Sequence, residues 1–128
     1  GAEGVQIGTR FALTEESSAS SVFKDYCLSL REGDTKLLLK KLAPTRLVKN
    51  AFREAVEKAE DSGASAEDLR TLLGRGRAKK GIFEGDLEEG ELEIGQVSAI
   101  ISRRQSVAEV MNELVAAYQR AAKKDYLF

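Results

Sequence analysis

Histidine and tryptophan are absent from this chain of 128 residues, and cysteine, proline and methionine each occur once. Without histidine, the chain alone cannot build a Ser-His-Asp triad, a Cys-His pair or a histidine-ligated metal site. A lone cysteine, Cys27, excludes an internal disulfide framework and a cysteine zinc site. There is also no charged start followed by an apolar stretch of the kind that marks secretion. We therefore expect a reducing, cytoplasmic setting and no metal site.

An excess of charge of one sign is missing as well. The chain has 20 Lys and Arg against 21 Asp and Glu, so nothing in the overall balance points to a nucleic acid or an anionic membrane as partner. No apolar run approaches the roughly 20 residues of a membrane span. Apolar residues make up 42% of the chain and recur periodically, which argues against disorder.

The start of the chain holds its most suggestive chemical feature. GVQIGTRFA, residues 4–12, alternates two apolar residues with Gln6 and then reaches Gly8 and Thr9, which predicts a short strand that runs into a turn. Glycine there lets a backbone approach a ligand closely, and the amides and hydroxyl that follow can donate to phosphate oxygens. On residue chemistry alone, a plain turn is the alternative.

Helical periodicity follows this turn. Thr14 is expected to cap a helix that Gly33 stops and whose buried face includes Cys27, a thiol we interpret as structural because no activating cation or base shares that face. Residues 35–42 fit either a strand or a helical turn. A second amphipathic helix is then predicted over residues 45–61.

Two further helices carry capping signals. Ser65 precedes a short helix that Gly74 ends. Ser106 and Glu109 form a capping box before the most regular helix of the chain. The predicted apolar face of that helix consists of Val107, Val110, Met111, Leu114, Val115 and Tyr118. The tail KKDYLF fits either an amphipathic docking segment or an end packed on its own domain.

Residues 74–95 are rich in glycine and in charge, with a basic block followed by an acidic one. Opposite blocks so close in sequence are expected to pair with each other or to stay solvated. GRGRAKKG lacks the spacing of a dinucleotide fingerprint and of a phosphate loop, and GDLEEGELEIG lacks the spacing of an EF-hand. We interpret GRGRAKKG as a flexible basic connector and GDLEEGELEIG as an acidic, turn-rich loop, with metal binding as a minor alternative for the latter.

Two segments, VQIGTRF at residues 5–11 and FEGDLEEGELEIGQVSAII at residues 83–101, carry a family resemblance. The chain resembles the C-terminal part of the FMN-dependent enoyl-acyl-carrier-protein reductases (type II) and of the related nitronate monooxygenases, which are 2-nitropropane dioxygenase-like proteins. The match continues through TEESSAS, REGDT and PTRLVKNAFRE, in the expected order, and covers nearly the whole chain.

The resemblance implies an α/β fold, the C-terminal part of a (β/α)8 TIM barrel with a mostly helical inserted subdomain. Residues 1–32 would be the last barrel strand and its helix, 33–94 a helical excursion over the active site, and 95–128 the returning segment with the terminal helix. A complete barrel needs eight parallel strands and typically about 250 residues. We therefore expect an incomplete barrel, extended and exposed, whose partner is the remainder of the same protein.

The resemblance also implies a cofactor site. The Gly-Thr after this strand holds the FMN phosphate in the family, and here the pair is Gly8 and Thr9. Gln6 corresponds to a position beside the cofactor, and Gln96 to one in the returning segment that borders the site. The family's catalytic histidine lies earlier in the barrel, so no catalytic residue is expected in this chain.

The implied function is NAD(P)H-dependent reduction of an enoyl-acyl-carrier-protein thioester through FMN, in fatty acid synthesis, with a homodimer as the expected assembly. One alternative within the family is a nitronate monooxygenase, which uses FMN and oxygen on nitroalkanes. A second alternative is a non-catalytic helical interaction module, which the amphipathic helices at 45–61 and 107–122 would suit.

Overall fold

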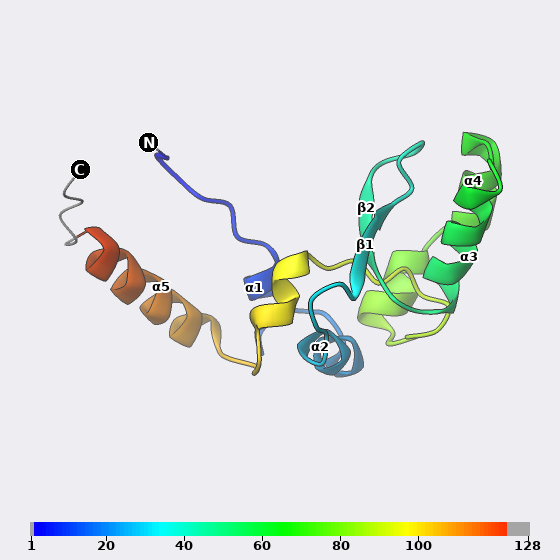
Figure 1. Cartoon of the computed structure of the whole chain (residues 1–128). Coiled ribbons are helices and arrows are strands. Elements are labelled where there is room, and N and C mark those ends of the chain that lie inside the picture. Colours follow the sequence, from blue (N-terminus) through cyan, green and yellow to red (C-terminus); the bar gives the residue numbers. More distant parts are fainter. Residues whose placement is uncertain (1, 123–128) are drawn as a thin grey trace.

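The computed structural model describes residues 2–122, so the tail KKDYLF lies outside the described residues. Figure 1 shows an elongated arrangement, with the N-terminal segment and the last helix at one end and a small sheet with two helices at the other. The elements in chain order are α1 (Thr9–Ala12), α2 (Ser21–Leu28), β1 (Thr35–Leu38), β2 (Thr45–Val48), α3 (Ala51–Asp61), α4 (Ala66–Leu73), the π-helical turn η1 (Lys79–Phe83), the 3-10 helix η2 (Gln96–Ile100) and α5 (Val107–Ala122). Within residues 2–122, no helix is both long enough and apolar enough to cross a membrane.

The barrel strand predicted at the start of the chain is not hydrogen-bonded to another strand. Residues 4–7 run as an extended segment up to Gly8 (Figure 1), and the sheet that the described residues form is the pair β1–β2. A strand needs a neighbour to satisfy its backbone, and none lies beside this segment in the described part of the chain. Val5 is accordingly 83% exposed. The segment is therefore unpaired and exposed, as an incomplete barrel implies, and its place as a barrel strand stays a prediction.

A hairpin replaces the start of the helix predicted over residues 45–61. β1 and β2 pair antiparallel, with Thr35 opposite Val48, and α3 begins only at Ala51. Leu47 and Val48 belong to different hydrophobic clusters, because successive strand residues point to opposite faces. Two adjacent buried residues fit a helix as well as a strand, so the local pattern alone did not show this. The excursion over residues 33–94 thus contains a small sheet as well as helices.

The first long helix is also shorter than predicted. Ser20 caps α2 by accepting from the Phe23 amide at 3.2 Å, whereas the Thr14 hydroxyl donates to the carbonyl of Phe11 at 2.7 Å. The expected cap at Thr14 was therefore wrong. The turn between them is held by the buried ammonium of Lys24, which donates to the carbonyls of two turn residues.

Several local predictions are confirmed. Ser65 caps α4 in a reciprocal capping box with Asp68, and Ser106 does the same for α5 with Glu109. The basic and acidic blocks pair with each other at Arg77–Glu89, Lys79–Glu84 and Lys80–Asp86. Cys27 is fully buried, and burial raises the pKa of its thiol to about 12, which fits a structural role.

Two hydrophobic clusters hold the chain together. The first joins α2 to the segment that returns after residue 90, and it includes Leu13, Phe23, Cys27, Leu30, Val48, Leu92, Ile94 and Ile101. The second lies under the hairpin, α3 and α4, and it includes Leu38, Leu39, Leu47, Phe52, Val56 and Leu69. The first cluster fixes the returning segment beside α1, and this places the candidate site.

Candidate functional site

A cleft of about 630 Å³ opens at the start of α1, and we call it the α1 cleft. Its walls come from the extended segment, α1, η2 and α5. The lining residues are Gln6, Ile7, Gly8, Thr9, Arg10, Val97, Ile100, Ile101 and Leu114. Three of the four predicted site residues, Gln6, Gly8 and Thr9, are therefore brought together in one place.

Gly8 begins α1 and leaves room in front of it. Its carbonyl accepts from the amides of Phe11 and Ala12 at 3.0 and 2.9 Å, which closes the first turn of the helix. A Cβ built on Gly8 would meet no atom within 4 Å. The first amides of a helix have no acceptor inside the helix, so the amide of Thr9 can donate to a ligand.

Thr9 is held by the returning segment. Its hydroxyl oxygen accepts from the amide of Gly95 at 3.0 Å, which leaves the hydroxyl proton free to be donated. A Cβ on Gly95 would lie 2.4 Å from that oxygen, so a glycine is needed for this contact. Sequence reasoning missed the role of Gly95, because no local pattern shows which residue a glycine will approach.

Gln96 is not part of the α1 cleft. Its side chain is exposed and lines a neighbouring hollow of about 680 Å³, together with Glu32, Thr35 and Arg46. Val97 and Ile100 line both hollows, so they form the wall between them. The Gln96 side chain thus lies on the other side of this apolar wall from the α1 cleft, although its neighbour Gly95 contacts Thr9.

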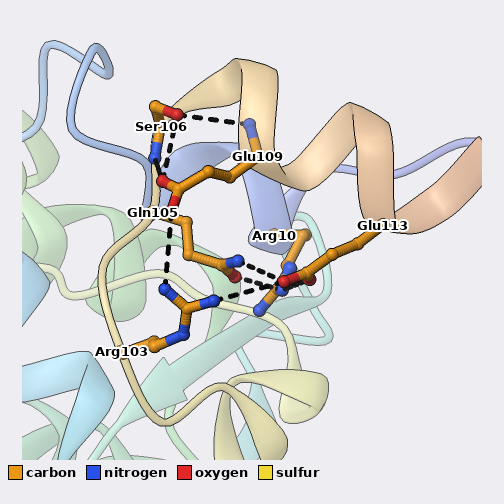
Figure 2. Close-up of polar contacts among 6 residues, drawn as sticks. All are labelled: Arg10, Arg103, Gln105, Ser106, Glu109 and Glu113. Carbon is orange, nitrogen blue, oxygen red and sulfur yellow. Dashed lines mark hydrogen bonds and ion pairs between the residues drawn. The ribbon is translucent and has the colours of Figure 1, made fainter.

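Arg10 is the charged residue among those that line the α1 cleft. Its guanidinium donates to the Gln105 side-chain oxygen and, at 2.8 Å, to the carboxylate of Glu113 on α5. Figure 2 shows these side chains meeting between α1 and the first turns of α5. The polar set continues to Arg103, whose guanidinium donates to Glu113 at 3.3 Å.

The chemistry available in the α1 cleft is recognition of an anion beside an apolar wall. A helix start, a threonine hydroxyl and an arginine provide donors, and Ile7, Ile101 and Leu114 provide apolar surface. Apart from the Thr9 hydroxyl, the lining residues include no acid, base or nucleophile of the usual catalytic kinds. In the described part of the chain, no cluster of three metal-ligating side chains is found.

Comparison with known proteins gives a consistent picture. A family model described as nitronate monooxygenase matches residues 1–117. A protein of Bacillus subtilis (strain 168), described as "Probable nitronate monooxygenase", is 31% identical over 115 residues, which are 89% of this chain and 33% of that protein. The resemblance drawn from the sequence is confirmed.

Solved structures agree at the level of the fold. The structure of FabK from Thermotoga maritima is similar with a TM-score of 0.80 and 28% identity, over 97% of this chain and 39% of that chain. A single-residue mutant of the same protein gives a TM-score of 0.78 and 25% identity, over 97% of this chain and 37% of that chain. These proteins are TIM barrels, and the chain spans little more than a third of their length.

Proposed function

Because the chain belongs to the nitronate monooxygenase family, we propose that it is the part of an FMN-dependent oxidoreductase that holds the cofactor phosphate. The observation that carries this proposal is the turn at Gly8 and Thr9, which opens a helix inside a cleft and carries a hydroxyl fixed by Gly95. The resemblance drawn from the sequence implies the same place for the phosphate.

The residues present fit such a group. A phosphate dianion is bound best by several hydrogen-bond donors at a helix start, and this site offers the Thr9 amide and hydroxyl. The open space in front of Gly8 leaves room for a phosphate oxygen to approach the backbone. When bound, FMN supplies the hydride-transfer chemistry, and the chain supplies binding and orientation. Gln6 and Leu114 line the same cleft and would lie beside the cofactor.

The exposed apolar surface next to the cleft supports the remainder of the barrel as the partner. Only Val110 of the predicted apolar face of α5 is buried, whereas Met111, Val115 and Tyr118 are 45%, 47% and 73% exposed. Together with Val5 they line a shallow groove of about 680 Å³. An apolar surface of this kind needs cover, and the unpaired segment beside it needs a neighbouring strand.

Within the family, we propose reduction of an enoyl-acyl-carrier-protein thioester with NAD(P)H. The support is the likeness to FabK, an enoyl-acyl-carrier-protein reductase, over 97% of this chain. A nitronate monooxygenase is the second candidate, supported by the Bacillus relative and the family model. Full-length protein assayed with crotonyl thioester and NAD(P)H, and separately with a nitronate and oxygen, distinguishes the two.

The cofactor proposal is tested first by the visible absorption spectrum of the purified full-length protein. We expect a flavin band for the wild type and a weaker flavin band for Gly8→Ala. Gly8→Val should lose it, since the larger side chain fills the space of the phosphate. The backbone at Gly8 has φ −100°, and an added Cβ meets no atom, so the substitution itself should not unfold the protein. Normal FMN occupancy in Gly8→Val contradicts the assignment, and a wild type that takes up no flavin favours the helical interaction module.

A further inference from the structure

Arg10 connects the proposed phosphate site to the last helix. It follows Thr9 directly in α1, and its side chain is 26% exposed where it pairs with Glu113. The same terminal nitrogen donates to Gln105 and to Glu113, so this nitrogen is held by two acceptors (Figure 2). Charge-assisted hydrogen bonds are stronger than neutral ones, and two acceptors on one nitrogen restrict the orientation of the side chain as well as its distance.

The acceptors of Arg10 are themselves held in place. Gln105 is 3% exposed, and its amide nitrogen donates to Glu113 at 2.6 Å. The backbone carbonyl of Gln105 accepts from the amide of Glu15 at 3.0 Å. With Arg103 donating to it as well, Glu113 has donors from three residues and little freedom to turn away.

The start of α5 is fixed to the same N-terminal segment. Glu109 accepts from the amide and hydroxyl of Ser106 at 2.7 and 3.0 Å and completes the capping box. The amide of Val107 donates to the Glu16 carboxylate at 3.0 Å. Residues 10–16 and the first two turns of α5 therefore form one polar frame around the base of the α1 cleft.

We infer that Arg10 is a positioning residue for the phosphate subsite. Its contacts with Glu113 and Gln105 fix the start of α1 against α5. The contact with α5 therefore contributes to the preference for FMN over riboflavin. The inference rests on the proposed function. Its reason is geometric, because donors to a phosphate lose strength steeply when they are displaced, and α1 has only four residues to hold its own position. Riboflavin has no phosphate, so its affinity should not depend on the frame.

The test is the dissociation constant of FMN and of riboflavin, measured by flavin fluorescence with full-length apoprotein. Arg10→Gln and Glu113→Gln should each weaken FMN binding about tenfold, because each breaks the charge-assisted contact between Arg10 and Glu113. Each should leave riboflavin binding within about twofold. The double variant should be little worse than either single variant, because both remove the same contact. Asp68→Asn is the matched control: its carboxylate also accepts from the amide and hydroxyl of a capping serine, Ser65, at 2.9 and 2.7 Å, but it lies outside this frame, so the FMN-to-riboflavin ratio should stay unchanged.

The outcomes separate this inference from the proposed function. A wild type that binds FMN no more tightly than riboflavin overturns both. Unchanged FMN affinity in Arg10→Gln, with the affinity lost in Gly8→Val, overturns the inference alone. If the variants weaken the binding of FMN and riboflavin equally, the protein is loosened in general, and the inference is overturned. It is also overturned if Arg10→Gln weakens FMN binding and Glu113→Gln does not, because Arg10 then acts without α5. If Arg10→Gln shows no cooperative melt, Arg10→Lys replaces it, with an expected loss in FMN affinity smaller than tenfold.

Discussion

The hydroxyl oxygen of Thr9 and the backbone amide of Gly95 lie 3.0 Å apart in a hydrogen bond that joins residues 86 positions apart in the sequence. Gly95 has φ −70°, a conformation open to any residue, so backbone strain does not explain why glycine stands there. The reason is the closeness of the contact, since a Cβ would lie 2.4 Å from the Thr9 oxygen. The Thr9 side chain thus contacts the backbone of the returning segment directly, because Gly95 has no side chain of its own.

Gly95→Ala should therefore move Thr9 and destabilise the protein by about 1–3 kcal/mol, the usual cost of overpacking. Combining it with Thr9→Ala removes the clashing oxygen, so the double variant should lose less than the sum of the two single losses. Urea denaturation of the four proteins of this cycle provides the measurement. Gly4→Ala is the control, because a Cβ there meets no atom within 4 Å. Strictly additive losses would argue against the contact.

A second long-range connection depends on Asn50. Its side-chain oxygen caps α3 by accepting from the Arg53 amide at 2.9 Å, and its amide nitrogen donates to the carbonyls of Leu87 and Gly90 at 3.1 and 2.8 Å. One side chain thus begins a helix and holds the acidic loop against it.

Asn50→Ala should cost about 2–3 kcal/mol, because it removes a cap and leaves two carbonyls without a donor. Asn50→Asp should not restore the loss, since a carboxylate can cap the helix but cannot donate to the two carbonyls. Ser65→Ala, which removes a cap alone, is the matched comparison and should cost about 1 kcal/mol. The measurement is the free energy of unfolding in urea, and equal losses for Asn50→Ala and Ser65→Ala would contradict the double role.

Short sequence patterns correctly predicted the structural features that depend only on neighbouring residues. The capping boxes at Ser65 and Ser106 consist of residues three apart, and both are present. The predicted start of α3, at residue 45, was wrong because Leu47 and Val48 are adjacent and apolar, a pattern that fits a helix or a strand. They form a strand because each packs into a different hydrophobic cluster, one on either side of β2. The segment through Val5 has the alternation of a strand, but pairing requires a neighbour that the described residues do not include.

The candidate site divides in the same way. A glycine turn after alternating apolar residues is a short-range pattern and drew attention to Gly8 and Thr9, but a plain turn fitted it as well, and only the family resemblance implied a phosphate there. The structure places both residues in one cleft. Their supports, Gly95 and the Arg10–Glu113 pair, come from segments far along the chain, and nothing in the letters around them shows the contact. One sequence can suggest a candidate turn, whereas the residues that fix it in place are seen only once the chain is folded.

Glu91 gives the protein a built-in dependence on pH. The residue is 8% exposed, and its own amide donates to the carbonyl of Arg77 at 3.1 Å. Burial, followed by the nearby carboxylate of Glu93, raises the pKa of the Glu91 carboxyl from an ordinary value of 4.5 to about 7, and the charge of Arg77 opposes this only in part. At mildly acidic pH the folded protein therefore keeps a proton that the unfolded chain has released.

The sign of the effect follows from that difference in proton binding. Well below pH 4.5 the Glu91 carboxyl is protonated in both the folded and the unfolded chain, so it does not lower the free energy of unfolding. That free energy falls as the pH rises from 4.5 through about 7. Glu91→Gln mimics the protonated form, so it should match the wild type near pH 4.5 and exceed its stability by about 1–3 kcal/mol at pH 8. Urea denaturation at both pH values measures this, with the exposed Glu84→Gln as the control that should leave the pH dependence unchanged. If Glu91→Gln and the wild type lose stability in parallel between these two pH values, Glu91 is not the group responsible.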